Sequence, residues 1–347
     1  MKLFHLRHVD WVDSQLIYHA QARVDVEGIN ILAPSSPYVC IGYHQNLEQE
    51  VDLEYCKENG IPVFRREVGG GAVFLDGNQI FYQIVLHKEN PLTKGGKAEF
   101  FERMLQPVVD TYNELGIPSK FRPVNDVITA DGRKIAGTGA AEIGDYIILV
   151  GNLIADFDYK TMARVLRVPD EKYRDKVFKS LSENLTTIKR EIGKIPTWDE
   201  MANPLLRNYE KVLGHLESSP LPGEVRSEMD RSRAGYLSDE WLYKKRRESD
   251  GRNVKIATDV NIIQNVYKAP GGLIRTTFEL KDEKILNPSI SGDFFCYPSD
   301  LITCLEKTMN GSDISSLKSI LDNFYADPEI EIPGISPDDW IKAFAKK

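Results

Sequence analysis

The sequence predicts an α+β protein made of a larger N-terminal domain and a small C-terminal one. Its 347 residues exceed what one average hydrophobic core requires, which points to about two domains. Short runs rich in β-branched and aromatic residues occur together with amphipathic helical segments. A charged run at 244–251 then separates two parts of different character, so the expected domains are residues 1–250 and residues 251–347.

The composition is that of a globular protein in water, because hydrophobic residues make up 41% of the chain and charged residues 28%. The formal net charge of −8 argues against a general nucleic-acid-binding role. No apolar run approaches the roughly 20 residues of a membrane span, and the N-terminus has no signal-peptide core, so a cytoplasmic location is expected. The four cysteines form no Cys-x-x-Cys pair and the six histidines have no ligand spacing, so a structural metal site is not expected.

The first quarter of the chain predicts strands that alternate with short helices. A strand followed by a helix is expected within residues 3–22. Further strands are expected at 29–34, 38–41 and 61–64, and a helix at 51–59 that ends at Gly60. The strand at 61–64 leads directly into the arginine–glycine segment described below.

The middle of the chain predicts a long helix and a hairpin. Apolar residues recur at helical spacing from Lys97 to Leu115, and Gly116 follows them as a terminator. Asp131-Gly132 lies between two strand-like runs, which is a hairpin signal. The other predicted elements are strands at 80–86 and 146–154 and helices at 161–166, 198–213 and 238–242, whereas no form is assigned to 182–188.

The C-terminal part predicts strands followed by helices. Three strand-like runs come first, and residues 268–275 contain a turn and the start of the second strand. Residues 291–295 are expected to close a hairpin. The predicted strands are 261–267, 273–280 and 284–289, and the predicted helices are 301–309, 314–325 and 338–344.

One segment combines arginines with glycines in a way that suits an anion. Arg65-Arg66 stands shortly before three consecutive glycines and the apolar run Ala72-Val73-Phe74. Glycine allows a ligand to approach the backbone closely, and successive exposed N–H groups form an anion-binding concavity. Arginine adds a planar fork for phosphate or carboxylate oxygens. Two interpretations fit: a loop that cradles a nucleotide or an acyl phosphate, and a glycine-rich turn beside solvated arginines.

The predicted hairpin carries a lysine among small residues. Glycines and alanines flank Lys134, so one long cation could project from a low surface into a cleft. The alternative is an ordinary hairpin lysine in solvent. The sequence favours the alternative until Lys134 is combined with the other motifs.

The motifs, taken in order, resemble those of the lipoate–protein ligases, adenylate-forming enzymes that attach lipoic acid to a lysine of an acceptor domain. The resemblance covers almost the whole chain. It rests on Arg65-Arg66 before Gly69-Gly70-Gly71-Ala72-Val73-Phe74, then Asp76-Gly77-Asn78, Asn125-Asp126, Gly132-Arg133-Lys134-Ile135-Ala136-Gly137 and Gly151-Asn152-Leu153-Ile154. The segments 268–272 and 291–295 look like the accessory C-terminal domain of that family.

The resemblance implies a fold and a reaction. The fold would be a catalytic domain of the biotin/lipoate-ligase type, with a mixed sheet flanked by helices. Lipoate or octanoate would react with ATP and Mg²⁺ to give an acyl-adenylate, and the amine of the acceptor lysine would then displace AMP. The implied acceptors are lipoyl domains of 2-oxoacid dehydrogenases, the glycine-cleavage H protein and H-like lipoate-binding proteins.

The resemblance also implies roles for individual residues. Lys134 would be the catalytic cation, placed between carboxylate and phosphate oxygens. Asp126 would contact the nucleotide or bind Mg²⁺. The residues expected to bind the acyl-adenylate are Arg66, Gly69, Gly70, Gly71, Ala72, Asn78, Asn125, Asp126 and Gly137.

The chain departs from the family pattern at several side chains. Val68, Leu75, Ala140-Ala141 and Val150 stand where polar residues are common, which makes the expected pocket more apolar. Three other functions remain open: an octanoyltransferase of the same fold, some members of which use a cysteine acyl-enzyme; a biotin ligase, which fits the motif order less well; and a non-catalytic acyl-binding or scaffold protein.

Overall fold

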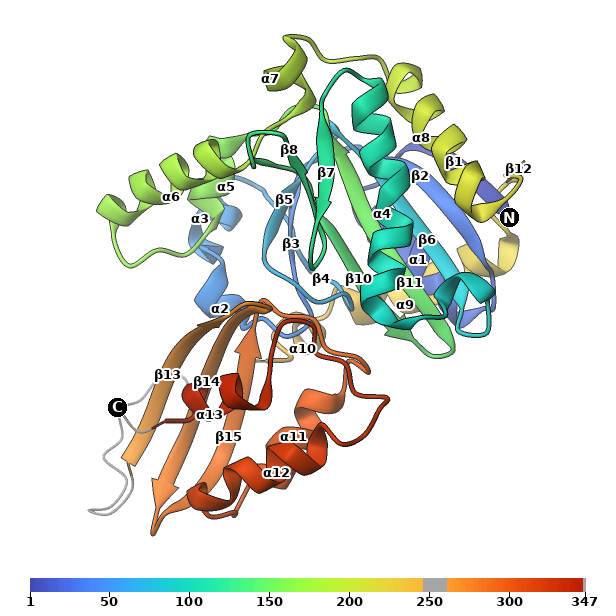
Figure 1. The fold of residues 1–347 in the computed structure, drawn as a ribbon. Helices are drawn as coiled ribbons and strands as arrows, with labels where there is room; N and C mark the ends of the chain where they lie inside the picture. The colour runs from blue at the N-terminus through green and yellow to red at the C-terminus, as the bar shows by residue number, and fades with distance from the viewer. Residues whose placement is uncertain (246–260, 346–347) are drawn as a thin grey trace.

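The computed structural model describes residues 1–245 and 261–345, which form an upper and a lower part in Figure 1. The expected boundary between residues 250 and 251 lies outside the described residues. The upper part contains β1 (Lys2–Val9), α1 (Asp13–Arg23), β2 (Gly28–Pro34), β3 (Tyr38–Ile41), α2 (Leu47–Glu50), α3 (Leu53–Glu58), β4 (Val63–Arg65), β5 (Val73–Leu75), β6 (Gln79–His87), the 3-10 turn η1 (Pro91–Thr93), α4 (Gly96–Glu114), β7 (Ser119–Arg122), β8 (Asp126–Thr129), β9 (Lys134–Ala136), β10 (Thr138–Ile143), β11 (Tyr146–Ile154), α5 (Tyr159–Val165), α6 (Glu171–Asn184), α7 (Ile188–Ile192), α8 (Trp198–Leu213), β12 (Glu217–Ser218), α9 (Gly223–Tyr236) and α10 (Asp239–Leu242).

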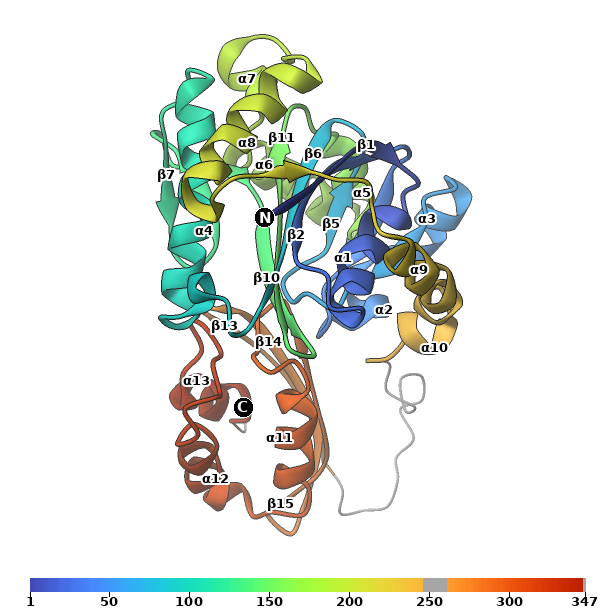
Figure 2. The same ribbon diagram turned by 90° about the vertical axis from the view of Figure 1, so that its right-hand side faces the viewer.

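The upper part is organised around a mixed sheet with helices on both faces. The strand order is β10-β11-β6-β2-β1-β12, in which β1 runs parallel to β2 and to β12, and the other neighbours are antiparallel. Figure 2 shows α4 and α8 on one side of this sheet and α1 and α9 on the other. The predicted α+β class and the predicted mixed sheet flanked by helices are confirmed.

Each face of the sheet has its own hydrophobic core. Apolar residues of α4 and α8, such as Phe101 and Leu205, pack against the sheet in the larger core. On the other face, Leu16 and Ile17 of α1 pack with Val225 of α9. The spacing that predicted the helix from Lys97 to Leu115 therefore marks a buried stripe.

Two small sheets lie beside the large one. In the sheet β4-β3-β5, Ile41 pairs with Arg65 of β4 and Cys40 pairs with Val73 of β5. Since β4 and β5 lie on opposite sides of β3, the loop between them crosses from one side of β3 to the other. In the sheet β7-β8-β9, β8 and β9 form the hairpin that Asp131-Gly132 predicted. We call residues 66–72 the glycine loop.

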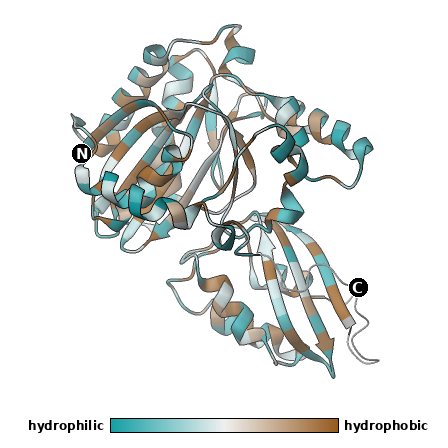
Figure 3. Ribbon diagram, turned by 180° about the vertical axis from the view of Figure 1, so that it is seen from behind, coloured by the Kyte–Doolittle hydropathy of each residue, from teal (hydrophilic) through white to brown (hydrophobic). Residues whose placement is uncertain are grey.

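The lower part is a three-stranded antiparallel sheet covered on one face by helices. Figure 3 shows its uncovered face, where teal and brown bands alternate along the strands. The core of this part contains residues between Ala269 and Phe344 only. Its elements are β13 (Asn261–Ala269), β14 (Gly272–Lys281), β15 (Lys284–Gly292), α11 (Leu301–Met309), the 3-10 turn η2 (Ile314–Ser316), α12 (Leu317–Phe324) and α13 (Pro337–Ala343).

The prediction that residues 291–295 close a hairpin is wrong. Ser291 and Gly292 are the last residues of β15, and the chain then runs into the upper part instead of turning back. The carboxylate of Asp293 accepts a hydrogen bond from the N–H of Leu273, which ends the ladder between β14 and β15. The turn-like residues of this segment therefore end β15, and the chain continues to the upper part.

The sequence also left some helices unassigned. Residues 182–188 contain the end of α6 and the start of α7, and none of the α6 residues is buried, so no apolar stripe marked that helix. α9 was not predicted, because its few buried residues are separated by many charged ones. None of the described helices is both long and apolar enough to span a bilayer.

His19 on α1 is buried without charge, which makes the stability of the fold depend on pH. Burial, with help from Arg23, lowers the pKa of His19 to about 4 although Glu67 opposes the shift. The imidazole Nε2 accepts a hydrogen bond from the N–H of Glu67 at 3.2 Å. Neutral His19 stabilises the fold fully above its unfolded pKa near 6.5, and this stabilisation is lost as the pH falls from 6.5 towards 4.

We expect His19→Gln to flatten this pH dependence, because glutamine can accept the same hydrogen bond and does not titrate. Between pH 6.5 and pH 4 the free energy of unfolding of the wild type should fall by about 3 kcal/mol more than that of the variant. Urea denaturation at a series of pH values measures the difference. If the free energy of unfolding depended on pH in the same way in both proteins, protonation of His19 would not be what destabilises the fold at low pH.

Candidate active site

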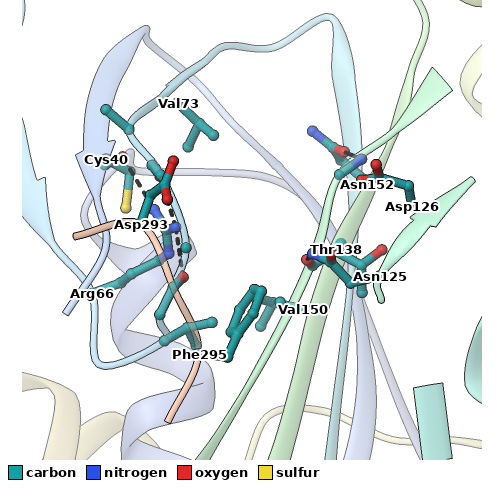
Figure 4. A pocket seen from close by; sticks show the side chains of 18 of the residues that line it. Cys40, Arg66, Val73, Asn125, Asp126, Thr138, Val150, Asn152, Asp293 and Phe295 are labelled. Carbon is teal, nitrogen blue, oxygen red and sulfur yellow. Dashed lines mark hydrogen bonds between the residues drawn. The ribbon is translucent and has the colours of Figure 1, made fainter. Parts of the chain in front are cut away.

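A cavity of about 440 Å³ lies where the glycine loop, strands β9 to β11 and the C-terminal part meet. Figure 4 shows Arg66 and Cys40 on one side of it and Asn125 and Asp126 on the other, with Phe295 between the two sides. Of the residues expected to bind an acyl-adenylate, the cavity wall contains Arg66, Gly69, Gly70, Gly71, Ala72, Asn125, Asp126 and Gly137, and it also contains Lys134. The structure thus brings together motifs that are far apart in the sequence.

Arg66 holds the glycine loop in shape. Its Nη1 donates to the carbonyl of Cys40 at 3.1 Å, and its Nη2 donates to the carbonyls of Gly69 and Gly71 at 2.8 and 2.9 Å. Arg66 as a whole residue is 9% exposed. Three of its five N–H donors are therefore used inside the protein, which gives Arg66 a positioning role towards the loop.

The loop needs glycine at two positions. Gly70 has a φ of +90°, a left-handed conformation that side chains disfavour. A Cβ on Gly69 would lie 2.6 Å from the carbonyl oxygen of Phe294, so this glycine lets the C-terminal part approach. Among the described residues, the N–H groups of Gly71 and Ala72 donate no hydrogen bond to the protein. Both residues line the cavity, so these two N–H groups are available there as donors for an anion.

Lys134 stands on the opposite wall in a line of alternating charges. Its Nζ lies 2.7 Å from Oδ1 of Asp126, and Oδ2 of Asp126 accepts from Nη2 of Arg122 at 2.7 Å. Burial alone would raise the pKa of Asp126, but Lys134 and Arg122 outweigh it and hold that pKa below its usual value. Asp126 therefore stays ionised and fixes the ammonium of Lys134, which keeps two N–H donors for other oxygens.

Strand ends fix the polar residues around Lys134. Nδ2 of Asn125 donates to the carbonyl of Thr138, which ties β8 to β10. The N–H of Gly137 donates to Oδ1 of Asn152 at 3.1 Å, and Nδ2 of Asn152 donates to Gln79 at 2.6 Å. The backbone beside Lys134 is therefore held from two strands of the large sheet.

This arrangement fits the result of comparing the chain with known protein families. Residues 12–210, more than half of the chain, match the lipoyl protein ligase A/B catalytic domain family. The chain belongs to that family.

Relatives within the lipoyl protein ligase A/B family are named either as lipoate-protein ligases or as octanoyltransferases. The chain is 27% identical over 264 residues to the lipoate-protein ligase LplJ of Bacillus subtilis, which covers 75% of this chain and 74% of that protein. It is 24% identical over 255 residues to the octanoyltransferase LipM of Kyrpidia tusciae, which covers 67% of this chain and 92% of that protein. The chain is thus an enzyme of the family that contains both lipoate ligases and octanoyltransferases.

Solved structures of the family share the fold. A bipartite lipoate protein ligase of Thermoplasma acidophilum, described with its E2 lipoyl domain, is 27% identical with a TM-score of 0.63 and covers 72% of this chain and 98% of its own. A lipoate-protein ligase A bound with ATP is 24% identical with a TM-score of 0.59, and the match covers 70% of this chain and 98% of that one. The predicted catalytic-domain fold is confirmed.

Several residues of the family motifs do not line the cavity, and Asn78 and Arg65 are two of them. Asn78 is exposed in the turn before β6, where its N–H donates to Oδ1 of Asp76 at 2.9 Å, and it does not line the cavity. Arg65 is fully buried, and its guanidinium donates to backbone carbonyls that include those of Gln45 and Leu242, at 2.7 and 2.8 Å. The role of Asn78 in adenylate binding stays a prediction, whereas Arg65 joins α10 to the strands.

The departures from the family pattern fall into two groups. Val68, Leu75 and Val150 line the cavity, so they place apolar side chains where the resemblance led us to expect polar ones. Ala140 and Ala141 are buried in the larger core and do not line it. Three of the departures can therefore act on a ligand directly, and the alanines act through packing.

Sequence reasoning missed the contribution of the C-terminal part to this wall. Segments 268–272 and 291–295 were recognised as accessory-domain motifs, yet neither was assigned to the site. It also missed Cys40 and Gln83, which lie on strands and read as core residues. The C-terminal residues of the cavity wall are Lys268, Pro270, Gly271, Gly272, Asp293 and Phe295.

Proposed function

We propose that the protein is an ATP-dependent lipoate–protein ligase, which activates lipoate or octanoate as an acyl-adenylate and transfers the acyl group to a lysine of an acceptor protein. The observation that carries the proposal is the placement of Lys134 beside Asp126, across the cavity from the donor-rich glycine loop. A fixed cation and preorganised N–H groups on opposite walls suit a substrate that develops negative charge between them.

The first half-reaction joins the acid to the nucleotide. A carboxylate oxygen of lipoate attacks the α-phosphorus of ATP, the bond to the β-phosphate breaks, and pyrophosphate leaves. Negative charge then lies on the α-phosphate oxygens and on the carboxylate. The two N–H donors of Lys134 that Asp126 does not use can bond one oxygen of each group, which stabilises the transition state.

The second half-reaction transfers the acyl group. The neutral amine of the acceptor lysine attacks the acyl carbonyl, the bond from that carbon to AMP breaks, and the amine loses one proton as the amide forms. The N–H groups of Gly71 and Ala72 can hold the adenylate phosphate while this occurs. Because the mixed anhydride is already activated, the protein needs no nucleophile of its own.

Mg²⁺ would arrive with the substrate. Among residues 1–245 and 261–345, no group of three histidine, cysteine, aspartate or glutamate side chains could hold a metal. The one carboxylate assigned to the metal, Asp126, already forms ion pairs with Lys134 and Arg122. Mg²⁺ in phosphoryl-transfer sites is held largely by substrate phosphates and water, so Asp126 would serve at most as one additional ligand.

The acceptor is proposed to be a lipoyl domain. The relative from Thermoplasma acidophilum was described with its E2 lipoyl domain, which supports this class of partner. Lipoyl domains of other 2-oxoacid dehydrogenases, the glycine-cleavage H protein and H-like lipoate-binding proteins are the candidates.

A donor test examines the proposed function. The protein is incubated with a purified lipoyl domain and either lipoate, ATP and Mg²⁺ or an octanoyl-carrier-protein thioester without ATP. Mass spectrometry of the acceptor should show modification in the first mixture, together with release of pyrophosphate. Modification only from the thioester would establish a transferase instead, and binding of the acids without either reaction would establish an acyl-binding protein.

The transferase alternative is kept because the chain matches an octanoyltransferase over most of that enzyme. Cys40 is the cysteine that lines the cavity among the described residues. It is fully buried, and burial raises the pKa of its thiol although Arg66 opposes the shift. A buried thiol with a raised pKa is a poor nucleophile at neutral pH.

Cys40→Ala should therefore leave the ligase rate within about threefold of the wild type, because no acyl-enzyme on Cys40 is required. The rate is measured as acceptor modification, and Cys56→Ala, at another buried cysteine away from the cavity, is the matched control. Loss of turnover in the Cys40 variant alone, with an acyl adduct on Cys40 of the wild type, would support the transferase.

A further inference from the structure

Phe295 belongs to the C-terminal segment by sequence and to the catalytic part by packing. It comes three residues after the end of β15, yet it belongs to the larger core of the upper part, and the residue is 7% exposed. The ring centroid is 6.2 Å from that of Phe101 on α4. Figure 4 shows the ring projecting between the glycine-loop side of the cavity and the strand that carries Val150.

Hydrogen bonds hold this segment in place on both sides of Phe295. The N–H of Gly70 donates to the carbonyl of Phe294 at 3.2 Å, and the hydroxyl of Tyr297 donates to the carbonyl of Ala140 at 3.1 Å. The N–H of Gly292 donates to the carbonyl of His44 at 3.0 Å. Phe295 is therefore fixed against the glycine loop and β10 at once.

The ring fills the space between two glycines on facing walls. A Cβ on Gly70 would lie 3.3 Å from Cζ of Phe295, and a Cβ on Gly139 would lie 3.3 Å from its Cε1. The same Cβ on Gly139 would lie 2.6 Å from Cγ1 of Val68. Phe295 and Val68 thus occupy the room that these glycines leave open.

Together with Val150, these side chains form one apolar surface inside the cavity. We call Val68, Val150 and Phe295 the apolar wall; all three line the cavity. The charged end of the cavity, at Lys134 and Asp126, lies on the β8–β9 side. An acid whose carboxylate is bound at Lys134 would extend its hydrocarbon chain along the apolar wall. A polar wall would suit the chain less well, because its polar groups would lose their hydrogen bonds to water and gain none from the hydrocarbon.

We propose that Phe295, supplied by the C-terminal part, limits the length of the acyl chain that the cavity accepts. The inference rests on the proposed function in one respect, namely that the ligand is an acyl acid. Val68 and Val150 give the wall its apolar character, and the ring of Phe295 closes it. Specificity for the acyl group is then determined jointly by the two parts of the chain.

Binding of straight-chain acids from hexanoate to dodecanoate tests this role. Each methylene that gains a buried place should tighten binding about fourfold. In the wild type this gain should stop at a certain chain length, which we call the wild-type limit. In Phe295→Ala it should continue for at least two more carbons, so the affinity of the acid two carbons longer, relative to the acid at the wild-type limit, should rise about 16-fold. Phe295→Leu, which keeps more of the apolar contact, should give a smaller shift.

Phe294→Leu is the matched control, since it changes the adjacent phenylalanine in the same segment. Phe294 stacks on His44 at 5.0 Å and meets Trp340 at 5.7 Å, and it does not line the cavity. Its variant should keep the wild-type order of affinities even if the C-terminal part is loosened. The same shift in Phe294→Leu as in Phe295→Leu would mean that docking, and not the ring of Phe295, sets the limit.

Calorimetry measures binding, and pyrophosphate release is recorded separately in the same proteins. An unchanged chain-length limit in both Phe295 variants overturns the inference even if the wild type forms adenylate. A shifted limit without pyrophosphate release supports the inference and contradicts the ligase function. No binding of any acid to the wild type overturns both.

Discussion

Lys134→Ala should lower the rate of acyl-adenylate formation by about 100- to 1,000-fold, because the variant loses the cation that stabilises charge on the α-phosphate and the carboxylate. The fold should persist, since the side chain is 35% exposed and Asp126 keeps its bond to Arg122. Pyrophosphate release under saturating ATP and lipoate measures the rate, and urea denaturation checks the stability.

Two further variants sharpen this result. Lys120→Ala removes an exposed lysine from β7 in the same small sheet and should leave the rate unchanged. Lys134→Arg keeps the charge but changes its geometry, so it should recover only part of the activity. A Lys134→Ala enzyme with near-normal activity would remove Lys134 from the reaction.

Arg66→Ala should act differently, through the shape of the glycine loop. Its loss leaves the buried carbonyls of Cys40 and Gly69 and the partly buried carbonyl of Gly71 without their donor, which should cost about 3 kcal/mol of unfolding free energy. Because the loop then loses its fixed N–H donors, substrate binding should weaken along with stability. Urea denaturation and the KM values for ATP and lipoate measure the two effects.

The Arg66 and Lys134 variants should differ in stability, which separates a support for the loop from a catalytic cation. An ammonium in Arg66→Lys cannot reproduce a planar fork that bonds three carbonyls, so this variant should also be destabilised. Lys134→Ala should reduce the rate and leave the stability unchanged. If Arg66→Ala instead weakened binding with no loss of stability, Arg66 would be a direct ligand contact and not a support for the loop.

Local patterns predicted much of the fold because they depend on short-range physics. The apolar stripe of α4, the hairpin at Asp131-Gly132 and the N-cap of α10 at Ser238 were all visible in the sequence. α6 was not, because a helix without a buried face has no hydrophobic period. α9 is mostly exposed, so its few buried residues gave a weak signal.

The family motifs predicted which residues approach the cavity better than they predicted what those residues do. The order of Arg66, the glycines and Lys134 along the chain indicated one site, and all of them line it. Bonding partners were not visible: Arg66 binds carbonyls of its own loop, and Asp126 is the counter-ion of Lys134. Such partners depend on how β3, β4 and β8 are arranged in space.

The contribution of the C-terminal part could not be predicted, because it depends on how two folded units meet. Phe295 lies in a motif whose composition is typical of a turn. The neighbouring residues do not indicate that its ring packs in the larger core of the upper part. The position of Asn78 could not be predicted either, because motif order does not show that its side chain lies in the exposed turn before β6 and not on the cavity wall.

Isotope tracing tests the central claim, activation of the acid by ATP, most directly. Lipoate labelled with oxygen-18 in its carboxylate is incubated with ATP, Mg²⁺, the protein and a lipoyl domain, and the AMP product is analysed by mass spectrometry. The attack of the carboxylate on the α-phosphorus predicts one oxygen-18 atom in each AMP. A modified lipoyl domain accompanied by unlabelled AMP, or by no AMP, would contradict the adenylate mechanism.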